Sequence, residues 1–155
     1  MSNKIAVIGL GNTLRRDDGI GIIILESLLS SYRRESLEYL NFGTASFDLI
    51  HRLDNYKKVL LIDAINAHLN PGELRIFELN KIKFSLKDAP TSSHELNLQD
   101  IFRLYKQFGI KAKVYVAGIQ VKDVSFEEGL TAPVKKEVKK ITEEIDNFIA
   151  TTLIK

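Results

Sequence analysis

The sequence of 155 residues contains no cysteine, which excludes disulfide bonds and thiol catalysis. It also lacks any apolar run close to the roughly 20 residues that a membrane-spanning helix needs. Neither a basic leader nor a small-residue cleavage site precedes the first apolar run, which a secretory signal would require. We therefore expect a cytoplasmic protein that does not contact a membrane.

The chain carries little excess charge of either sign. Its 22 basic and 20 acidic residues leave a formal net charge of +2, so bulk charge indicates no particular partner. The richest basic stretch, residues 135–140, has its apolar residues at helical spacing and is typical of a solvated helix face. Because a nucleic-acid binder would need a clustered basic surface, we expect no nucleic-acid partner. The length and the 45% hydrophobic content predict a single domain over residues 1–155.

Apolar patterning predicts strands that alternate with helices. Short apolar runs indicate buried strands over 5–8, 57–64 and 112–121, and weaker patterns indicate strands over 37–40 and 73–79. Helical spacing predicts helices over 20–34, 47–53, 92–108 and 133–152, with loops over 41–46 and 80–91. Ser92 and Glu95 have the spacing of a capping box. The pattern predicts an α/β fold: a single-domain three-layer sandwich with an open, twisted, mainly parallel sheet and helices on both faces.

Two carboxylates and one histidine stand where this fold would place a site. Ligands bind such sheets outside the carboxyl ends of the strands. Asp18 follows the glycine turn after the first strand, Asp63 closes the apolar run 59–62, and His94 lies at an expected helix start. Two oxygen ligands and an imidazole suit a borderline divalent metal such as nickel or zinc.

Each of these residues also has a purely structural interpretation. Asp17 and Asp18 could act in the first turn of a helix, where an acidic side chain gains about 0.3–1 kcal/mol from the helix dipole. Asp63 could bond to loop amides, and His94 could lie on the surface. The remaining histidines, His51 and His68, are interpreted as surface residues, although His68 follows Asp63 closely enough to stand near the same cleft.

The glycine turn does not indicate a nucleotide site. Gly9-Leu10-Gly11 is similar to the start of a dinucleotide-binding motif, but Leu14 occupies the third glycine position and no phosphate-binding lysine is present. A phosphate would need the positive end of the following helix. Asp17 and Asp18 stand there instead and would repel it.

Several segments in order resemble one known family. The sequence resembles the nickel-iron hydrogenase maturation endopeptidases in segments that span nearly the whole chain: Gly9 to Leu14, Asp17 to Gly21, Gly43-Thr44, Leu61 to Ala64, Ser93 to Leu96, Gly118 to Gln120 and Gly129 to Pro133. The family's usual proline after the Gly-Ile-Gln segment is replaced by Val121.

The resemblance implies a function and a set of site residues. Members of this family cut a C-terminal extension from a hydrogenase large-subunit precursor after nickel has been inserted. The nickel-contacting positions of the family fall on Asp18, Asp63 and His94, which leaves Asp17 as the helix cap. Gly43 and Thr44 are candidates for substrate binding. The family's open twisted sheet agrees with the fold predicted above.

The chemistry leaves several hypotheses open. Ser92, Ser93 and His94 are adjacent on a helix start and cannot form a serine-protease triad, whereas Asp18 and Asp63 could act in catalysis as a pair if they lie close together. We favour nickel that is carried by the precursor and gains ligands from this chain, which we expect to be a monomer. The alternatives are a non-enzymatic, chaperone-like module that binds a metallated partner, and a structural domain whose acids only cap helices.

Overall fold

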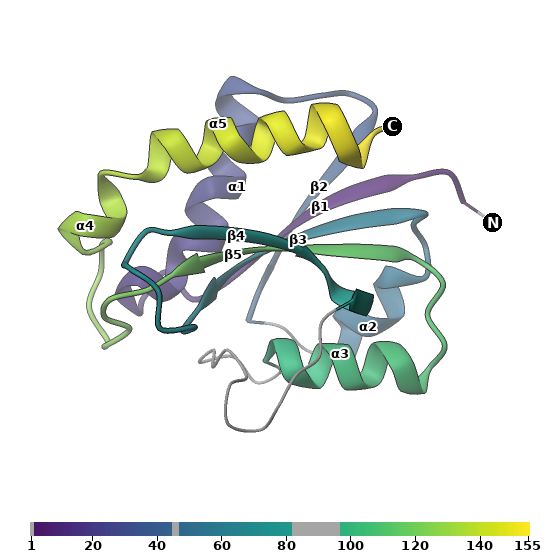
Figure 1. Ribbon diagram of the computed structural model, residues 1–155, viewed down its shortest axis with the longest axis horizontal. Coiled ribbons are helices and arrows are strands. Elements are labelled where there is room, and N and C mark those ends of the chain that lie inside the picture. The colour runs from purple at the N-terminus through teal and green to yellow at the C-terminus, as the bar shows by residue number, and fades with distance from the viewer. Residues whose placement is uncertain (1, 45–46, 82–96) are drawn as a thin grey trace.

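The fold is built on one five-stranded sheet. The computed structural model describes residues 2–44, 47–81 and 97–155, and its strands lie in the order β2-β1-β3-β5-β4 (Figure 1). Four strands are parallel and β4 is antiparallel to β5. The bounds are β1 Ile5–Leu10, β2 Leu37–Gly43, β3 Lys58–Ile65, β4 Leu74–Glu78 and β5 Lys113–Gln120. The predicted mainly parallel sheet is confirmed.

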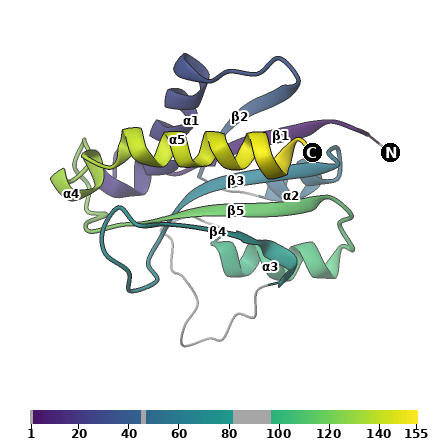
Figure 2. The same ribbon diagram turned by 45° about the horizontal axis from the view of Figure 1, so that its top comes forward.

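Helices cover both faces of this sheet. Helices α1 (Ile20–Ser31) and α5 (Val138–Phe148) lie over one face, and α2 (Phe47–Leu53) and α3 (Leu98–Gln107) lie over the other (Figures 1 and 2). The side chains of β3 alternate between the two apolar cores, because successive residues of a strand point to opposite faces. Leu60 packs on the α1 and α5 side and Leu61 on the α2 and α3 side. The predicted α/β sandwich is therefore confirmed.

The connections diverge beside the carboxyl end of β1. The chain leaves β1 through α1 to reach β2 on one side, and then passes through α2 to β3 on the other side of β1. Since α1 and α2 lie on opposite faces, the chain diverges at this point of the sheet. Open α/β sheets bind their ligands at such a divergence.

Two predicted boundaries are wrong. The loop expected over 41–46 begins later, because β2 continues to Gly43 and pairs with β1 across a register shift between Gly9 and Leu10. Helix α3 begins at Leu98 and not at Ser92, because Asn97 is extended and forms a capping box with Asp100. The Asn97 side-chain oxygen accepts from the Asp100 amide at 2.9 Å. Residues 92–96 lie outside the described residues.

The C-terminal helix is interrupted where one continuous helix was expected. A short helix, α4 (Ala132–Lys135), precedes α5, and a π-helical turn η3 (Ile149–Leu153) follows it. The interruption is a tighter turn in which the Glu137 amide donates to the carbonyl of Val134 at 3.0 Å. No helix in the described part of the chain has the length and apolar character needed to cross a bilayer.

Candidate active site

The glycine turn after β1 packs backbone against backbone. A Cβ added at Gly11 would lie 2.2 Å from the carbonyl oxygen of Asp18, and Gly11 adopts a φ of 146°. The Gly11 amide donates to the carbonyl of Gly43 at 2.8 Å. The turn therefore joins the ends of β1 and β2 to the segment that carries Asp18. These contacts explain the glycine at position 11 without any phosphate.

Asp18 lies in a 3₁₀ turn, η1 (Arg16–Gly19), directly before α1. Its side chain is buried, with 1% of the residue exposed. One of its carboxylate oxygens accepts a hydrogen bond from the Asn12 amide at 3.0 Å. The bond holds this carboxylate beside Asn12, in the turn that follows β1.

Asp63 lies near the end of the central strand β3 and is fully buried. Its Oδ1 accepts from the Ala64 amide at 2.8 Å. Along β3, Val59 and Leu61 pack into the core beneath α2 and α3. Because side chains alternate along a strand, Asp63 belongs to that same face.

The structure brings Asp18 and Asp63 to one edge of the sheet. Turn η1 packs against β3. Strand β3 pairs with β1, and the Asn12 amide in the turn after β1 donates a hydrogen bond to Asp18. Helix α3 also begins at this edge (Figure 1). His94, the third predicted ligand, lies outside the described residues. Among residues 2–44, 47–81 and 97–155, no three histidine, aspartate or glutamate side chains are placed to hold a metal ion.

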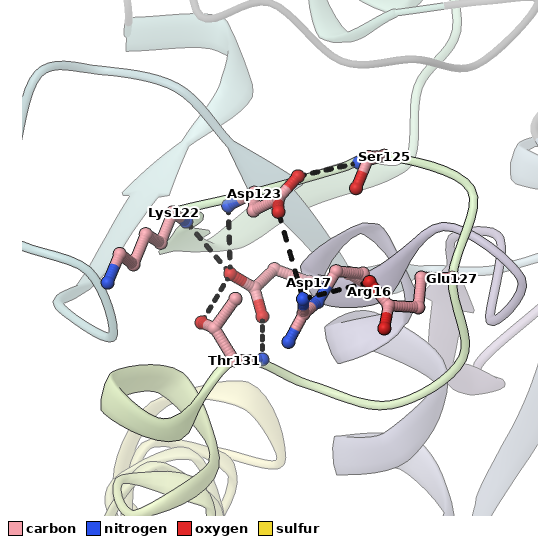
Figure 3. Close-up of polar contacts among 7 residues, drawn as sticks. All are labelled: Arg16, Asp17, Lys122, Asp123, Ser125, Glu127 and Thr131. Atoms are coloured by element: carbon pink, nitrogen blue, oxygen red, sulfur yellow. Dashed lines mark hydrogen bonds and ion pairs between the residues drawn. The ribbon is translucent and has the colours of Figure 1, made fainter.

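Asp17 does not cap the helix, so the prediction of its role is wrong. Its carboxylate accepts no capping bond within η1 and turns instead towards the loop that follows β5 (Figure 3). That loop offers four donors from Lys122, Asp123 and Thr131. These donors lie more than 100 positions further along the chain, which is why local spacing favoured a cap.

The same loop carries a small charged cluster beside η1. The Arg16 guanidinium lies 3.1 Å from Glu127 and 3.8 Å from Asp123 (Figure 3). Hydrogen bonds from Ser125, with a smaller contribution from the charge of Arg16, hold the pKa of Asp123 below its usual value. Asp123 is therefore ionised at neutral pH.

The other candidate residues lie at or near the surface. Gly43 ends β2 with a φ of 53°, and Thr44 next to it is exposed. His51 and His68 are exposed as predicted, and His68 has a φ of 58° in the loop after β3. Gly43 and Thr44 remain predicted substrate contacts.

One buried residue of this edge was not singled out from the sequence. The Gln120 side-chain oxygen accepts from the amides of Ala67 and Leu69 at 2.8 and 3.2 Å, so it holds the loop that contains His68. Gln120 is 4% exposed, and a buried polar side chain at the end of a strand is costly unless it is hydrogen-bonded. Its presence in the segment Gly118 to Gln120 was the available signal.

Comparison with known proteins decides the family. Residues 22–147 match the hydrogenase maturation protease family HycI. The chain belongs to the hydrogenase maturation proteases. As a hydrogenase maturation protease it is a peptidase, and the family match contains Asp63 and His94, whereas the glycine turn and Asp18 precede it.

Individual relatives are similar to this protein over most of its length. The protein is 28% identical to the coenzyme F420 hydrogenase subunit delta of Methanothermobacter thermautotrophicus, over 92% of each chain. The hydrogenase maturating endopeptidase HybD from E. coli has a TM-score of 0.76 and 26% identity, covering 95% of this chain and 92% of that one. The [NiFe] hydrogenase maturation protease HybD from Thermococcus kodakarensis has a TM-score of 0.73 and 27% identity, covering 94% and 98%.

Proposed function

We propose that this hydrogenase maturation protease removes a C-terminal extension from the large-subunit precursor of a nickel-iron hydrogenase after nickel insertion. Family membership supports a peptidase, and two relatives are an endopeptidase and a protease of [NiFe] hydrogenase. The observation that carries the proposal is the arrival of two buried carboxylates, Asp18 and Asp63, at the carboxyl edge of β1 and β3. The family assignment favours this hypothesis over a binding module that does not cut.

In this proposal nickel belongs to the substrate. Thiolates of the precursor hold the ion, and Asp18, Asp63 and His94 add ligands to it when the precursor docks. Two carboxylates and an imidazole are suitable donors for nickel. His94 precedes Asn97 by three residues, and Asn97 caps α3 over the face to which Asp63 belongs. This short connection supports a contribution from His94 at the same edge.

Nickel could serve the reaction in two ways. It could polarise the carbonyl of the scissile peptide, or it could lower the pKa of a water molecule that attacks this carbonyl. In both cases Asp18 and Asp63 hold the ion in place, and either carboxylate could take up a proton from the attacking water. Recognition through the ion makes cleavage conditional on nickel insertion, since an empty precursor lacks the group that these side chains bind.

The decisive experiment compares nickel-loaded and nickel-free precursor. Each is incubated with purified protein, and the mass of the precursor is followed by mass spectrometry. We expect a mass decrease equal to the C-terminal extension only for the loaded precursor. Equal cutting of both forms would contradict recognition through nickel, and binding without any mass change would favour the non-enzymatic module.

Substitutions test the individual ligands. Asp18→Asn, Asp63→Asn and His94→Ala should each reduce the rate of processing by more than about 100-fold, because each removes a ligand to the ion that is also used in the reaction. His51→Ala is the matched control, since His51 is exposed on α2. Thermal unfolding of every variant shows whether it remains folded. Normal processing by a ligand variant removes that residue from the site.

A further inference from the structure

Asp17 is a fully buried acid that the proposed reaction does not use. Its Oδ1 accepts from the Thr131 amide at 2.8 Å. Its Oδ2 accepts from the Thr131 hydroxyl at 2.7 Å and from the amides of Lys122 and Asp123 at 2.9 and 3.2 Å. Figure 3 shows all four donors converging on this one carboxylate. Such a set of donors fixes the side chain in one orientation.

The backbone on either side of Asp17 is attached to the same loop. The Asp17 amide donates to the carbonyl of Asp123 at 3.1 Å, and the Arg16 amide donates to the carbonyl of Glu127 at 2.9 Å. The Arg15 side chain donates to the carbonyl of Val124 at 3.0 Å. Arg16 has a φ of 43°, which is unfavourable for a residue other than glycine. The loop attachments hold the chain in this conformation.

The attachment of Asp17 determines where Asp18 points. The two residues are consecutive in a 3₁₀ turn, where successive side chains project about 120° apart. Asp17 is held by the loop after β5, while the Asp18 carboxylate meets the Asn12 amide at the end of β1. A rotation of η1 would break both sets of bonds together. The orientation of Asp18 therefore depends on the loop through Asp17.

We propose that Asp17 is a positioning residue that holds the Asp18 carboxylate in the orientation needed to bind the nickel of the precursor. This inference rests on the proposed function, in which Asp18 is a nickel ligand. Hydrogen-bonding partners that orient metal ligands commonly change metal affinity by about 10- to 100-fold when they are removed. Asp17 acts through the backbone of its neighbour and does not touch the metal.

The variant Asp17→Asn tests this role. It keeps the size of the side chain but replaces one acceptor oxygen with an NH2 group, which cannot accept the bonds that Asp17 receives. The matched control is Glu128→Gln, which removes one negative charge from an exposed position of the same loop. Ni²⁺ alone is the probe, and its half-saturating concentration is read from the broadening of backbone amide signals in NMR spectra. The same spectra show whether each variant is folded.

The expected result is a half-saturating Ni²⁺ concentration about 10- to 100-fold higher for Asp17→Asn and unchanged for Glu128→Gln. In the Asp18→Asn background, Asp17→Asn should add nothing, because the group that it positions is already lost. Wild-type nickel affinity in folded Asp17→Asn would overturn the inference. Additive losses of nickel affinity in the double variant would also overturn the inference, since Asp17 would then act independently of Asp18.

A second variant covers a failure of Asp17→Asn to fold. Thr131→Val removes only the hydroxyl donor and keeps the amide bond to Oδ1. A weaker nickel affinity of this variant supports the inference and an unchanged affinity contradicts it. The failure of the proposed function is distinct: unchanged nickel affinity in Asp18→Asn alone would refute Asp18 as a ligand and the inference with it. A loss of nickel affinity in Asp18→Asn without a loss in Asp17→Asn refutes the inference about Asp17 but leaves the proposed function standing.

Discussion

Gly21 lies where α1 crosses the backbones of β1 and β3, and Gly21→Ala is the sharpest test of that packing. A Cβ at this position would stand 2.2 Å from the carbonyl oxygen of Leu10 and 2.4 Å from that of Ile62. Both obstacles are backbone atoms, so no side chain can rotate away. Ordinary contact begins near 3.4 Å, so the start of α1 would have to move away from the sheet by about 1 Å.

The size of the effect follows from two opposing contributions. In a helix without this contact, Gly to Ala stabilises by about 1 kcal/mol. Overpacking of a well-packed interior costs about 1–3 kcal/mol and sometimes more, and two rigid carbonyls on one methyl group belong at the upper end of that range. We expect a net loss of about 2 kcal/mol in the free energy of unfolding, which corresponds to a fall of about 4–8 °C in Tm for a chain of this size.

Urea unfolding at pH 7, followed by circular dichroism, measures this loss. Ser30→Ala is the helix control, because Ser30 is exposed in α1 and should change stability by only a few tenths of a kcal/mol. Gly109→Ala is the backbone control: its φ is +58° but nothing lies within 4 Å, so it should lose about 1 kcal/mol. A Gly21→Ala protein as stable as the wild type would refute the reasoning.

Three further predictions concern other parts of the fold. Asn97→Ala should lower the free energy of unfolding by about 1 kcal/mol in urea titrations, because Asp100 loses its capping partner. Ile145→Ala, at a fully buried position of α5, should cost about 2–5 kcal/mol in the same assay. The Tyr56 hydroxyl donates to Glu38 at 2.6 Å and lowers the pKa of this acid. Tyr56→Phe should therefore lose stability at pH 7, by about 1 kcal/mol, and less at pH 3. Stabilisation by an acid with a lowered pKa is fully present above the pKa of the unfolded state. It disappears as the pH falls through the lower pKa of the folded state. An equal loss of stability at both pH values would contradict the stabilisation of ionised Glu38 by Tyr56.

The sequence was sufficient where a signal is local. The apolar run of β3 and the helical spacing of α2 and α1 predicted these elements within a few residues. The rule that ligands bind at the carboxyl ends of strands then placed Asp18 and Asp63 at one edge, where the structure has them. Their role as nickel ligands, the participation of His94, the monomeric state and the cytoplasmic location stay predictions.

The sequence was insufficient where a residue's partner lies far along the chain. Asp17 has the position of a helix cap, but a loop more than 100 residues away supplies its donors, and no spacing rule detects such a contact. The start of α3 was misplaced for a different reason. Ser92 with Glu95 and Asn97 with Asp100 both have the spacing of a capping box, so spacing alone could not locate the start of the helix that packs Leu98 and Ile101 in the core.

The order of the strands also has a consequence for synthesis on the ribosome. Strand β5 lies between β3 and β4 in the sheet but leaves the ribosome after both. Until residues 113–120 have emerged, β4 has no strand to pair with, and the flank of β3 that β5 will occupy is open. An open strand edge can pair with other chains. Nascent chains that stall shortly before residue 113 should therefore be the species most prone to aggregate and most in need of a chaperone.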